Sequence, residues 1–325
     1  MSSDFRVLTT HKPGGAFGYI SEGWLNALHD AGFVAERWDG SLSSWKSIGP
    51  HLYLGCSGHR QPIPSNKDRG HCKVAIHVNP WGEPYLPKIA EETSIRRWVR
   101  GQNPNVVFGY GFEKDRGFWS QWDTAGLSWV PMATAGDVVR YHPNLQKTQD
   151  LVYLGGYWKY KSGNLDAYLI PVIRELGGIV RGWGDWPLPN FGGSLDAAAA
   201  PSFLAAGKVG PCVAEPHTVA FGIDIPERVW KLALSGTAPV HDPVLGIKSV
   251  FPELWVAKNP IDYLRLLKVL LQDDERRLAY AKAAYSRVVT QHTYHHRLAG
   301  LLNRLGFTEQ AQTLLRRLAD YQWPQ

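Results

Sequence analysis

Cysteine, long apolar runs and an N-terminal apolar segment are scarce or missing in this sequence, and each absence excludes a class of protein. The three cysteines, Cys56, Cys72 and Cys212, are odd in number and form no Cys-x-x-Cys pair, which argues against a disulfide framework and a cysteine zinc site. No stretch has the roughly 20 apolar residues of a membrane-spanning helix. The first residues, MSSDFRVLTT, lack the apolar centre of a signal peptide. We therefore expect a cytoplasmic protein without a membrane span.

Sequence patterns that hold a metal ion are missing as well. No Asp-x-Asp cluster occurs, and the adjacent Asp273 and Asp274 fall in a helix-rich stretch. His292, His295 and His296 come without a carboxylate or cysteine at ligand spacing, so a polar helix face explains them better than a metal centre. The sequence predicts no metal site.

Length and charge favour a two-domain protein that binds anions. A chain of 325 residues exceeds one ordinary domain and fits two α/β domains. The formal charge of +6 favours nucleotide diphosphates, nucleic acid or a lipid surface without selecting among them. The fourteen tryptophans suit sugar or base stacking, but packing in a core is the commoner use of this residue.

Short apolar strands alternate with amphipathic helices in two similar series. The first series starts with a strand at 5–10 and a helix over 21–33, and the second restarts at 150–161 with a helix over 164–177. This alternation predicts an α/β fold with two Rossmann-like domains, each built on a parallel sheet, facing across a cleft and followed by a helical tail. The domains are predicted over 1–140 (acceptor side) and 141–305 (nucleotide-sugar side), with a C-terminal helix over 306–325 packing back toward the first.

The segment 210–239 has the order of strand, loop, helix, glycine stop and strand that builds an anion site. Asp224 occupies a helix N-cap position, Pro226 lies in the first turn, and Glu227 follows the cap by three residues, which together predict a capping box. Gly222 lets the preceding backbone pass closely, so that free N–H groups and the positive helix end face a phosphate. We predict a diphosphate site at the start of this helix.

This segment resembles the donor-binding segment of group 1 glycosyltransferases of the GT-B fold, most closely the spore-maturation-protein subgroup. The resemblance is carried by Arg228 at the helix start, by Ser235-Gly236 at its end, and by HTYHHRLAGLL over 292–302. It extends over most of the chain from about Leu127 onward. The first domain is similar only in general pattern.

One position departs from the resembled family. A glutamate that contacts the donor ribose usually stands five residues before the glycine, and this chain has Lys231 there. Glu227 lies one helical turn earlier, on the same face, and is a candidate substitute. The departure keeps open a second interpretation, in which the protein is a non-catalytic nucleotide- or glycan-binding structural component.

The resemblance implies a metal-independent transfer of a sugar from a nucleotide sugar, for which UDP is the expected nucleotide. Stabilisation of the departing diphosphate then falls to cations, and in the resembled family a basic residue at the first turn of the second domain does this. Trp183 either stacks on the nucleobase or packs at the domain joint. The residues expected to contact the donor are Gly14, Gly15, Lys159, Lys161, Trp183, Glu215, His217, Phe221, Gly222, Ile223, Glu227 and Arg228.

The acceptor side is expected in the first domain, where polar residues follow the strand 73–78 at its carboxyl end. If the reaction inverts configuration, His77 or Glu83 is the candidate general base. If it retains configuration, the leaving phosphate takes the proton and no base is required. The predicted catalytic residues are His77, Glu83 and Arg228.

The acceptor itself stays open at this point. The polar, basic loop 57–71 suits acceptor binding, and basic segments with aromatics at 95–100 and 112–122 suit a phosphate backbone. A hydroxymethylated base in DNA is therefore one acceptor candidate beside a polysaccharide, a surface protein or a small metabolite. A basic DNA-binding protein without catalysis is a further alternative. Donor sugar, stereochemistry and oligomeric state are not determined by the sequence.

Overall fold

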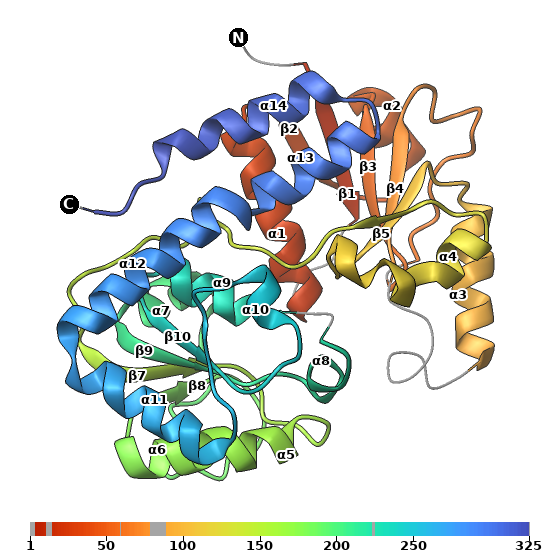
Figure 1. The fold of residues 1–325 in the computed structure, drawn as a ribbon. Helices are drawn as coiled ribbons and strands as arrows, with labels where there is room; N and C mark the ends of the chain where they lie inside the picture. Colours follow the sequence, from red (N-terminus) through yellow and green to blue (C-terminus); the bar gives the residue numbers. More distant parts are fainter. Residues whose placement is uncertain (1–3, 11–14, 59, 79–88, 223–224, 325) are drawn as a thin grey trace. The chain divides into compact units, whose positions relative to one another are not determined.

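Figure 1 shows the computed structural model of the protein, in which residues 4–10, 15–58, 60–78, 89–222 and 225–324 are described. The chain divides into two compact units. The first combines Met1–Thr134 with Tyr294–Ala319, and the second combines Ala135–Thr293 with Asp320–Gln325. Each unit is built on its own parallel sheet, which confirms the predicted α/β class with two Rossmann-like sheets.

The first unit contains, within the described ranges, a six-stranded parallel sheet in the order β2-β1-β3-β4-β5-β6. Its strands are mostly buried, because helices cover both faces. The strands are β1 Arg6–Thr10, β2 Val34–Trp38, β3 Leu52–Cys56, β4 Lys73–His77, β5 Val106–Gly109 and β6 Trp129–Pro131. The helices are α1 Gly15–Asp30, α2 Leu42–Ile48, α3 Ile89–Gly101, the 3₁₀ helix η1 Glu113–Trp119, α4 Ser120–Thr124, α13 Tyr294–Arg304, α14 Thr308–Arg317 and the short η4 Leu318–Asp320.

Helices from the two ends of the chain pack together in the first unit. Both α13 and α14 lie against α1 (Figure 1). The contact needs a glycine, because a Cβ on Gly23 of α1 would lie 2.3 Å from ring atoms of Tyr294 in α13. His295 Nε2 of α13 also lies 2.9 Å from Asp30 Oδ2 at the end of α1.

Tryptophan forms much of the first unit's core. Trp38, Trp45, Trp119, Trp122 and Trp129 are each at most 2 % exposed and belong to one cluster with strand residues of the same sheet. The rings of Trp119 and Trp129 stack with their centres 5.0 Å apart. Core packing is therefore the main use of tryptophan in this unit, as the sequence analysis favoured.

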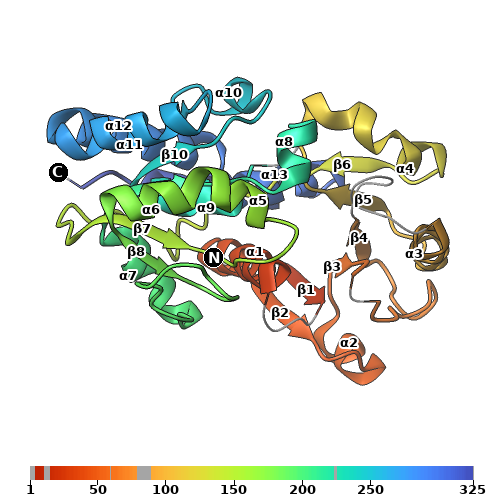
Figure 2. The ribbon, with the colours of Figure 1, turned by 90° about the horizontal axis from the view of Figure 1, so that it is seen from below.

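The second unit contains, in the part of the chain that the structure describes, a five-stranded parallel sheet in the order β11-β10-β9-β7-β8. Helices α6 and α11 cover one face, onto which Figure 2 looks from below, and α7, α9 and α12 cover the other. The strands are β7 Gln149–Leu154, β8 Ile179–Arg181, β9 Gly207–Cys212, β10 Ala238–His241 and β11 Trp255–Val256. The helices are α5 Ser162–Asn164, the π-helix η2 Leu165–Leu169, α6 Ile170–Leu176, the 3₁₀ helix η3 Ala197–Ala199, α7 Ala200–Ala205, α8 Pro216–Phe221, α9 Glu227–Leu234, α10 Ile247–Val250, α11 Pro260–Gln272 and α12 Asp274–Gln291.

Helix α9 starts later than the sequence predicts and ends where the sequence predicts. It begins at Glu227 instead of after a cap at Asp224, a residue outside the described ranges. Pro226 occupies the cap position with an extended backbone (φ −54°, ψ 133°) and forms no side-chain cap hydrogen bond, whereas the predicted capping box involves Asp224 and lies outside the described residues. Proline disfavours a helical backbone at the residue before it, so the helix starts behind Pro226. At the other end Ser235 is the C-cap and Gly236 has a φ of +67°, which confirms the predicted glycine stop.

None of the helices within the described ranges combines the length and the apolar composition that crossing a bilayer requires.

Candidate functional site

Buried polar groups gather at the carboxyl edge of the second sheet, where β7, β9 and β10 end at Leu154, Cys212 and His241. The loops that leave these strands and the first turn of α9 meet there. Ligand sites of open α/β sheets form at this edge, since the loops and helix N-termini face it. We call the group formed by Tyr153, Lys161, Glu215, Arg228, His241 and Asp242 the edge cluster.

Arg228 is the cation of α9 in this cluster. Its Nε donates to the carbonyl oxygen of Leu154 at 2.8 Å, and its guanidinium carbon lies 4.2 Å from the centre of the Tyr153 ring. The approach requires Gly155, because a Cβ there would lie 2.4 Å from Arg228 Nη2. Arg228 Nη1 and the Tyr153 hydroxyl are buried, and neither has a hydrogen-bond partner among the described residues. A half-buried cation with one unpaired nitrogen, beside an unpaired hydroxyl, is an arrangement that an anionic ligand completes.

Lys161 and Glu215 form the second charged contact. Lys161 Nζ lies 3.0 Å from Glu215 Oε1, and the Lys161 side chain is only 6 % exposed. Glu215 precedes α8 at its N-cap position, but its side chain does not cap the helix, and its Oε2 is buried without a partner in the described part of the chain. The pair therefore holds one carboxylate oxygen and leaves the other to accept a further donor.

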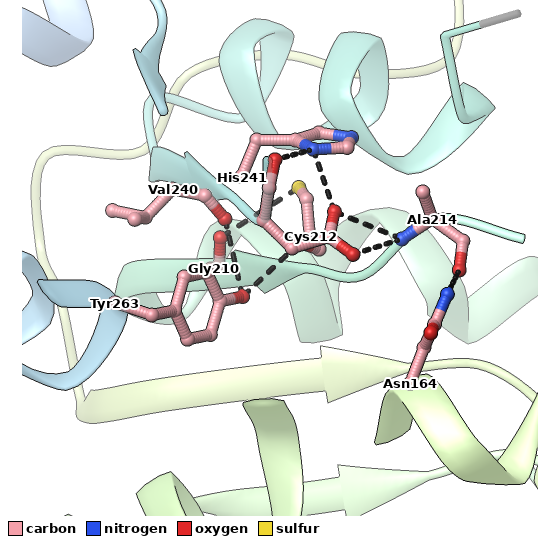
Figure 3. Close-up of polar contacts among 8 residues, drawn as sticks. Asn164, Gly210, Cys212, Ala214, Val240, His241 and Tyr263 are labelled. Atoms are coloured by element: carbon pink, nitrogen blue, oxygen red, sulfur yellow. Dashed lines mark hydrogen bonds and ion pairs between the residues drawn. The ribbon is translucent and has the colours of Figure 1, made fainter. Parts of the chain in front are cut away.

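Both polar groups of Ala214 are held by side chains, which fixes the loop before Glu215 (Figure 3). The two carboxylate oxygens of Asp242 each lie 3.1 Å from the Ala214 backbone N–H. The Asn164 side-chain amide donates to the Ala214 carbonyl at 3.1 Å. Tyr263 supports the strand ends from below, since its hydroxyl lies 3.1 Å from the carbonyl of Cys212.

His241 lies beside Asp242 with one ring nitrogen in contact and one without a partner. Its Nδ1 lies 2.8 Å from both the carboxylate and the carbonyl oxygen of Asp242. Both of these oxygens only accept, so Nδ1 is the donor in these contacts. The ring is fully buried, and Nε2 has no hydrogen-bond partner among the described residues.

The cysteine in this region is not a nucleophile. Cys212 is fully buried, and burial raises the pKa of its thiol to about 12. A thiol with such a pKa stays protonated at neutral pH, and the thiolate is the reactive form.

The remaining donor residues predicted in the second unit are placed around the edge cluster to different degrees. Lys159 is exposed in the turn before α5. Trp183 is 60 % exposed and lies against Gly156, where a Cβ would come within 2.3 Å of its ring. Gly222 has a φ of +64°, and a Cβ there would lie 2.3 Å from the carbonyl oxygen of Leu245. His217 and Phe221 belong to α8, and Ile223 lies outside the described residues.

Glu227 and Lys231 share one face of α9, as their spacing predicts. Lys231 Nζ lies 2.9 Å from Glu227 Oε2, and both side chains are largely buried. Lys231, which stands where the resembled family has a glutamate, therefore pairs with Glu227, the candidate substitute for that glutamate.

In the first unit, the structure describes only part of the predicted acceptor site. Glu83 and Gly14 lie outside the described residues, and Gly15 is the first residue of α1. His77 ends β4 and is 3 % exposed, with its ring 4.3 Å from that of Tyr110 and 5.5 Å from that of Phe17. Burial lowers the pKa of His77 to about 3, and its Nε2 has no hydrogen-bond partner among the residues that the structure describes. A base this weak would need contact with water or substrate before accepting a proton, so its catalytic role stays a prediction.

The histidines of the C-terminal segment have structural contacts. His292 Nε2 lies 3.1 Å from the Val250 carbonyl, and its ring stacks on Trp230 with centres 5.0 Å apart. His295 pairs with Asp30, and both residues belong to the first unit. Within the described ranges, no three His, Cys, Asp or Glu side chains gather as a metal site would require.

The sequence analysis missed five members or supports of the site: Tyr153, Asn164, His241, Asp242 and Tyr263. The His-Asp pair directly follows a predicted strand, at the carboxyl edge where sites gather, and that position was an available signal. Tyr153 lies inside a strand and Asn164 inside a helix start, so no local pattern distinguishes either from an ordinary packing residue.

Comparison with known proteins places this geometry in a familiar fold. Residues 166–303 match the model of a family described as glycosyl transferase-like. The T4 phage protein BGT in complex with UDP-glucose is similar with a TM-score of 0.56 and 10% identity, over 94% of this chain and 99% of that one. Another structure is described as the DNA-modifying enzyme β-glucosyltransferase, and it matches with a TM-score of 0.52 and 10% identity over 97% of this chain and 100% of that one.

A third solved structure is similar over a smaller share of its length. TarM, a protein of S. aureus, has a TM-score of 0.57 and 13% identity, and the match covers 78% of this chain and 54% of TarM. No curated protein sequence matches the chain significantly. The two parallel sheets and these similarities show that the chain has the GT-B glycosyltransferase fold, and residues 166–303 form a glycosyl transferase-like segment.

Proposed function

We propose that this protein is a glycosyltransferase that binds a nucleotide sugar, with UDP as the nucleotide, at the edge cluster of the second unit. The observation that carries the proposal is the buried, unpaired Nη1 of Arg228 beside the unpaired Tyr153 hydroxyl. A diphosphate supplies the negative charge and the acceptor oxygens that both groups lack. The glycosyl transferase-like segment, which includes all of α9, supports the assignment.

The transfer breaks the bond between the anomeric carbon and a phosphate oxygen, so negative charge grows on the departing diphosphate. Arg228 is held by Leu154 and Tyr153, and this preorganised cation stabilises that charge without moving. Lys161 adds a second positive charge next to Glu215. These two cations are the basis for proposing that the transfer proceeds without a metal ion.

The other donor contacts follow from the same placement. Glu215 Oε2 accepts a hydrogen bond from a hydroxyl of the transferred sugar, and the exposed Trp183 stacks on the nucleobase. Glu227 reaches the ribose with one oxygen while Lys231 keeps the other. Membership in the spore-maturation-protein-like subgroup is part of the proposal and rests on the residues from Arg228 to Gly236.

We propose a hydroxyl group as the acceptor, and a hydroxymethylated base in DNA is our first candidate. The similar β-glucosyltransferase is described as a DNA-modifying enzyme, and the chain studied here carries a formal charge of +6. His77 and Glu83 are the candidate bases if configuration is inverted.

The testing experiment measures release of nucleoside diphosphate from a panel of nucleotide sugars by the purified protein. Parallel reactions contain a chelator, Mg²⁺ or Mn²⁺, each with and without hydroxymethylated DNA. Release from one donor in the presence of chelator supports metal-independent transfer, and stimulation by DNA identifies the acceptor class. Activity that requires the added metal contradicts the proposed metal independence and leaves the proposed sugar transfer standing. No release and no UDP binding by calorimetry would overturn the donor site.

A second candidate function is non-catalytic nucleotide binding, favoured by the Lys231–Glu227 pair. Binding of UDP without turnover on any donor, together with turnover gained by the variant Lys231→Glu, would support this alternative.

A further inference from the structure

The amino edge of the first sheet carries two adjoining hollows of about 360 Å³ and 300 Å³. They lie where β4 begins at Lys73 and β5 at Val106, and they share Lys73 and Asn105. The second hollow extends to Arg304 at the end of α13. We call the two hollows together the amino-edge trough.

The trough is lined by cations without a carboxylate. Its positively charged side chains are Arg69, Lys73 and Arg304, and no Asp or Glu is among the described residues that line it. Lys73 Nζ forms no hydrogen bond or ion pair with a described residue, and Arg304 donates only to the Ser128 hydroxyl, at 3.1 Å. Three cations in one recess repel one another, and a bound anion removes that repulsion.

Arg69 shows that one of these cations is partly withdrawn from water. Its guanidinium donates to the Asn66 side-chain oxygen, a neutral partner. Burial lowers the pKa of Arg69 from its ordinary value, and no carboxylate offsets this effect. A partly desolvated cation with only an amide partner gains more from an anion than a solvated surface lysine does.

Neutral donors complete the lining. Asn105 accepts the Val74 backbone N–H at 2.7 Å through its side-chain oxygen, which fixes the amide and leaves its NH₂ group to donate. Asn103, at the turn before it, has a left-handed backbone with a φ of +45°. Cations and amide donors together form the donor set that phosphate oxygens accept.

The trough includes residues of the loop 57–71, which the sequence predicts for acceptor binding, but it is separate from the predicted catalytic residue His77. Lys73 and His77 are the two ends of β4, so about 13 Å of strand, four steps of about 3.3 Å, separates the trough from the carboxyl edge. A ligand in the trough therefore does not occupy the position of the reacting hydroxyl in the same unit.

We propose that the amino-edge trough binds consecutive phosphodiester groups of DNA and thereby holds a nucleic-acid acceptor on the first unit. Two hollows with shared lining residues fit neighbouring phosphates of one chain better than a single ion. The lining is polar and recessed, which suits a phosphate backbone and not a lipid surface. The inference rests on the proposed function only for the choice of DNA as the polyanion.

The test is binding of a fluorescently labelled DNA duplex to the full-length protein, measured by anisotropy over a series of salt concentrations and without any nucleotide sugar. The trough variant Arg69→Gln/Lys73→Gln/Arg304→Gln removes three positive charges. Its matched control, Lys258→Gln/Arg276→Gln/Lys282→Gln, removes three from exposed cations of the second unit. Circular dichroism and thermal unfolding confirm that both variants fold.

We expect the trough variant to bind DNA at least about tenfold more weakly, and the slope of log K against log salt concentration to fall by roughly 2.7, about 0.9 for each lost phosphate contact. The control should retain most of the affinity. Equal weakening of both variants would overturn the proposal in favour of a general charge effect. Competition by UDP would place the DNA at the edge cluster instead, and stronger binding to anionic lipid vesicles than to DNA would overturn the choice of ligand.

These outcomes are independent of turnover. DNA binding by the trough without sugar transfer contradicts the proposed function and leaves the trough assignment standing. Transfer to a small acceptor without DNA binding does the reverse.

Discussion

The guanidinium of Arg228 lies over the ring of Tyr153, with 4.2 Å between its carbon and the ring centre. Arg228 comes from α9 and Tyr153 from β7, and Gly155 makes the approach sterically possible. The contact with the ring fixes the guanidinium in place, and Nη1 has no hydrogen-bond partner among the described residues. A rigid, unpaired cation at the carboxyl edge of a sheet is the central feature of the proposed donor site.

Replacing Arg228 by Gln should weaken binding of UDP about ten- to a hundredfold, because a hydrogen bond to a charged group contributes about 1.5–3 kcal/mol. Isothermal titration calorimetry measures the loss. Arg276→Gln is the control, since Arg276 is an exposed cation paired with Asp273. Unchanged UDP affinity in a folded Arg228→Gln protein would contradict the donor site.

Replacing Lys161 by Met should lower the free energy of unfolding by about 1–3 kcal/mol, because Glu215 then keeps a largely desolvated carboxylate without its partner. The range allows for the partial exposure of Glu215. The double variant Lys161→Met/Glu215→Gln should recover part of the loss. Urea denaturation measures both, and a double variant less stable than the single one would show that the pair is not the cause.

Replacing Trp183 by Ala should weaken UDP binding without changing the melting temperature, because the side chain is 60 % exposed and contributes little to the core. Stacking on a base is worth about 1–3 kcal/mol, or roughly five- to a hundredfold in affinity. Trp183→Phe should keep most of it. If the Ala variant melts earlier and binds UDP normally, Trp183 has a packing role.

His77 should make the free energy of unfolding decrease as the pH is lowered. Burial holds the pKa of this residue near 3 in the folded state, below its ordinary value of 6.5. The unfolded chain therefore takes up the proton first. The contribution is fully present above pH 6.5 and is lost as the pH falls toward 3, at about 1.4 kcal/mol per unit.

The variant His77→Phe isolates this term. The difference in unfolding free energy between native protein and variant should shrink or reverse by about 2 kcal/mol between pH 6 and 4.5. Urea denaturation at each pH measures it, and subtraction cancels the titration of the carboxylates. A difference independent of pH would show that His77 is accessible to protons in the folded state.

Local patterns were sufficient for much of the fold and for part of the site. The apolar strand at 150–154 and the glycine stop at Gly236 were readable because hydrophobic periodicity and a positive φ leave direct marks in a sequence. The start of α9 was placed too early. The pattern of Asp224, Pro226 and Glu227 predicts a cap at Asp224, whereas Pro226 is the cap in the structure. Arg228 was identifiable by its place in a resembled segment, whereas its contact with Tyr153 was not.

The sequence by itself determined the alternation of strands and helices, the two parallel sheets and the helix that carries Arg228, because these depend on neighbours along the chain. Only the tertiary structure decided which distant groups meet: Tyr294 against Gly23, Asp242 on the Ala214 backbone, and Lys161 on Glu215. It also decided which polar atoms stay unpaired. Burial and partnership depend on the packing of whole elements, and a single sequence does not record the distances between residues that lie far apart in it.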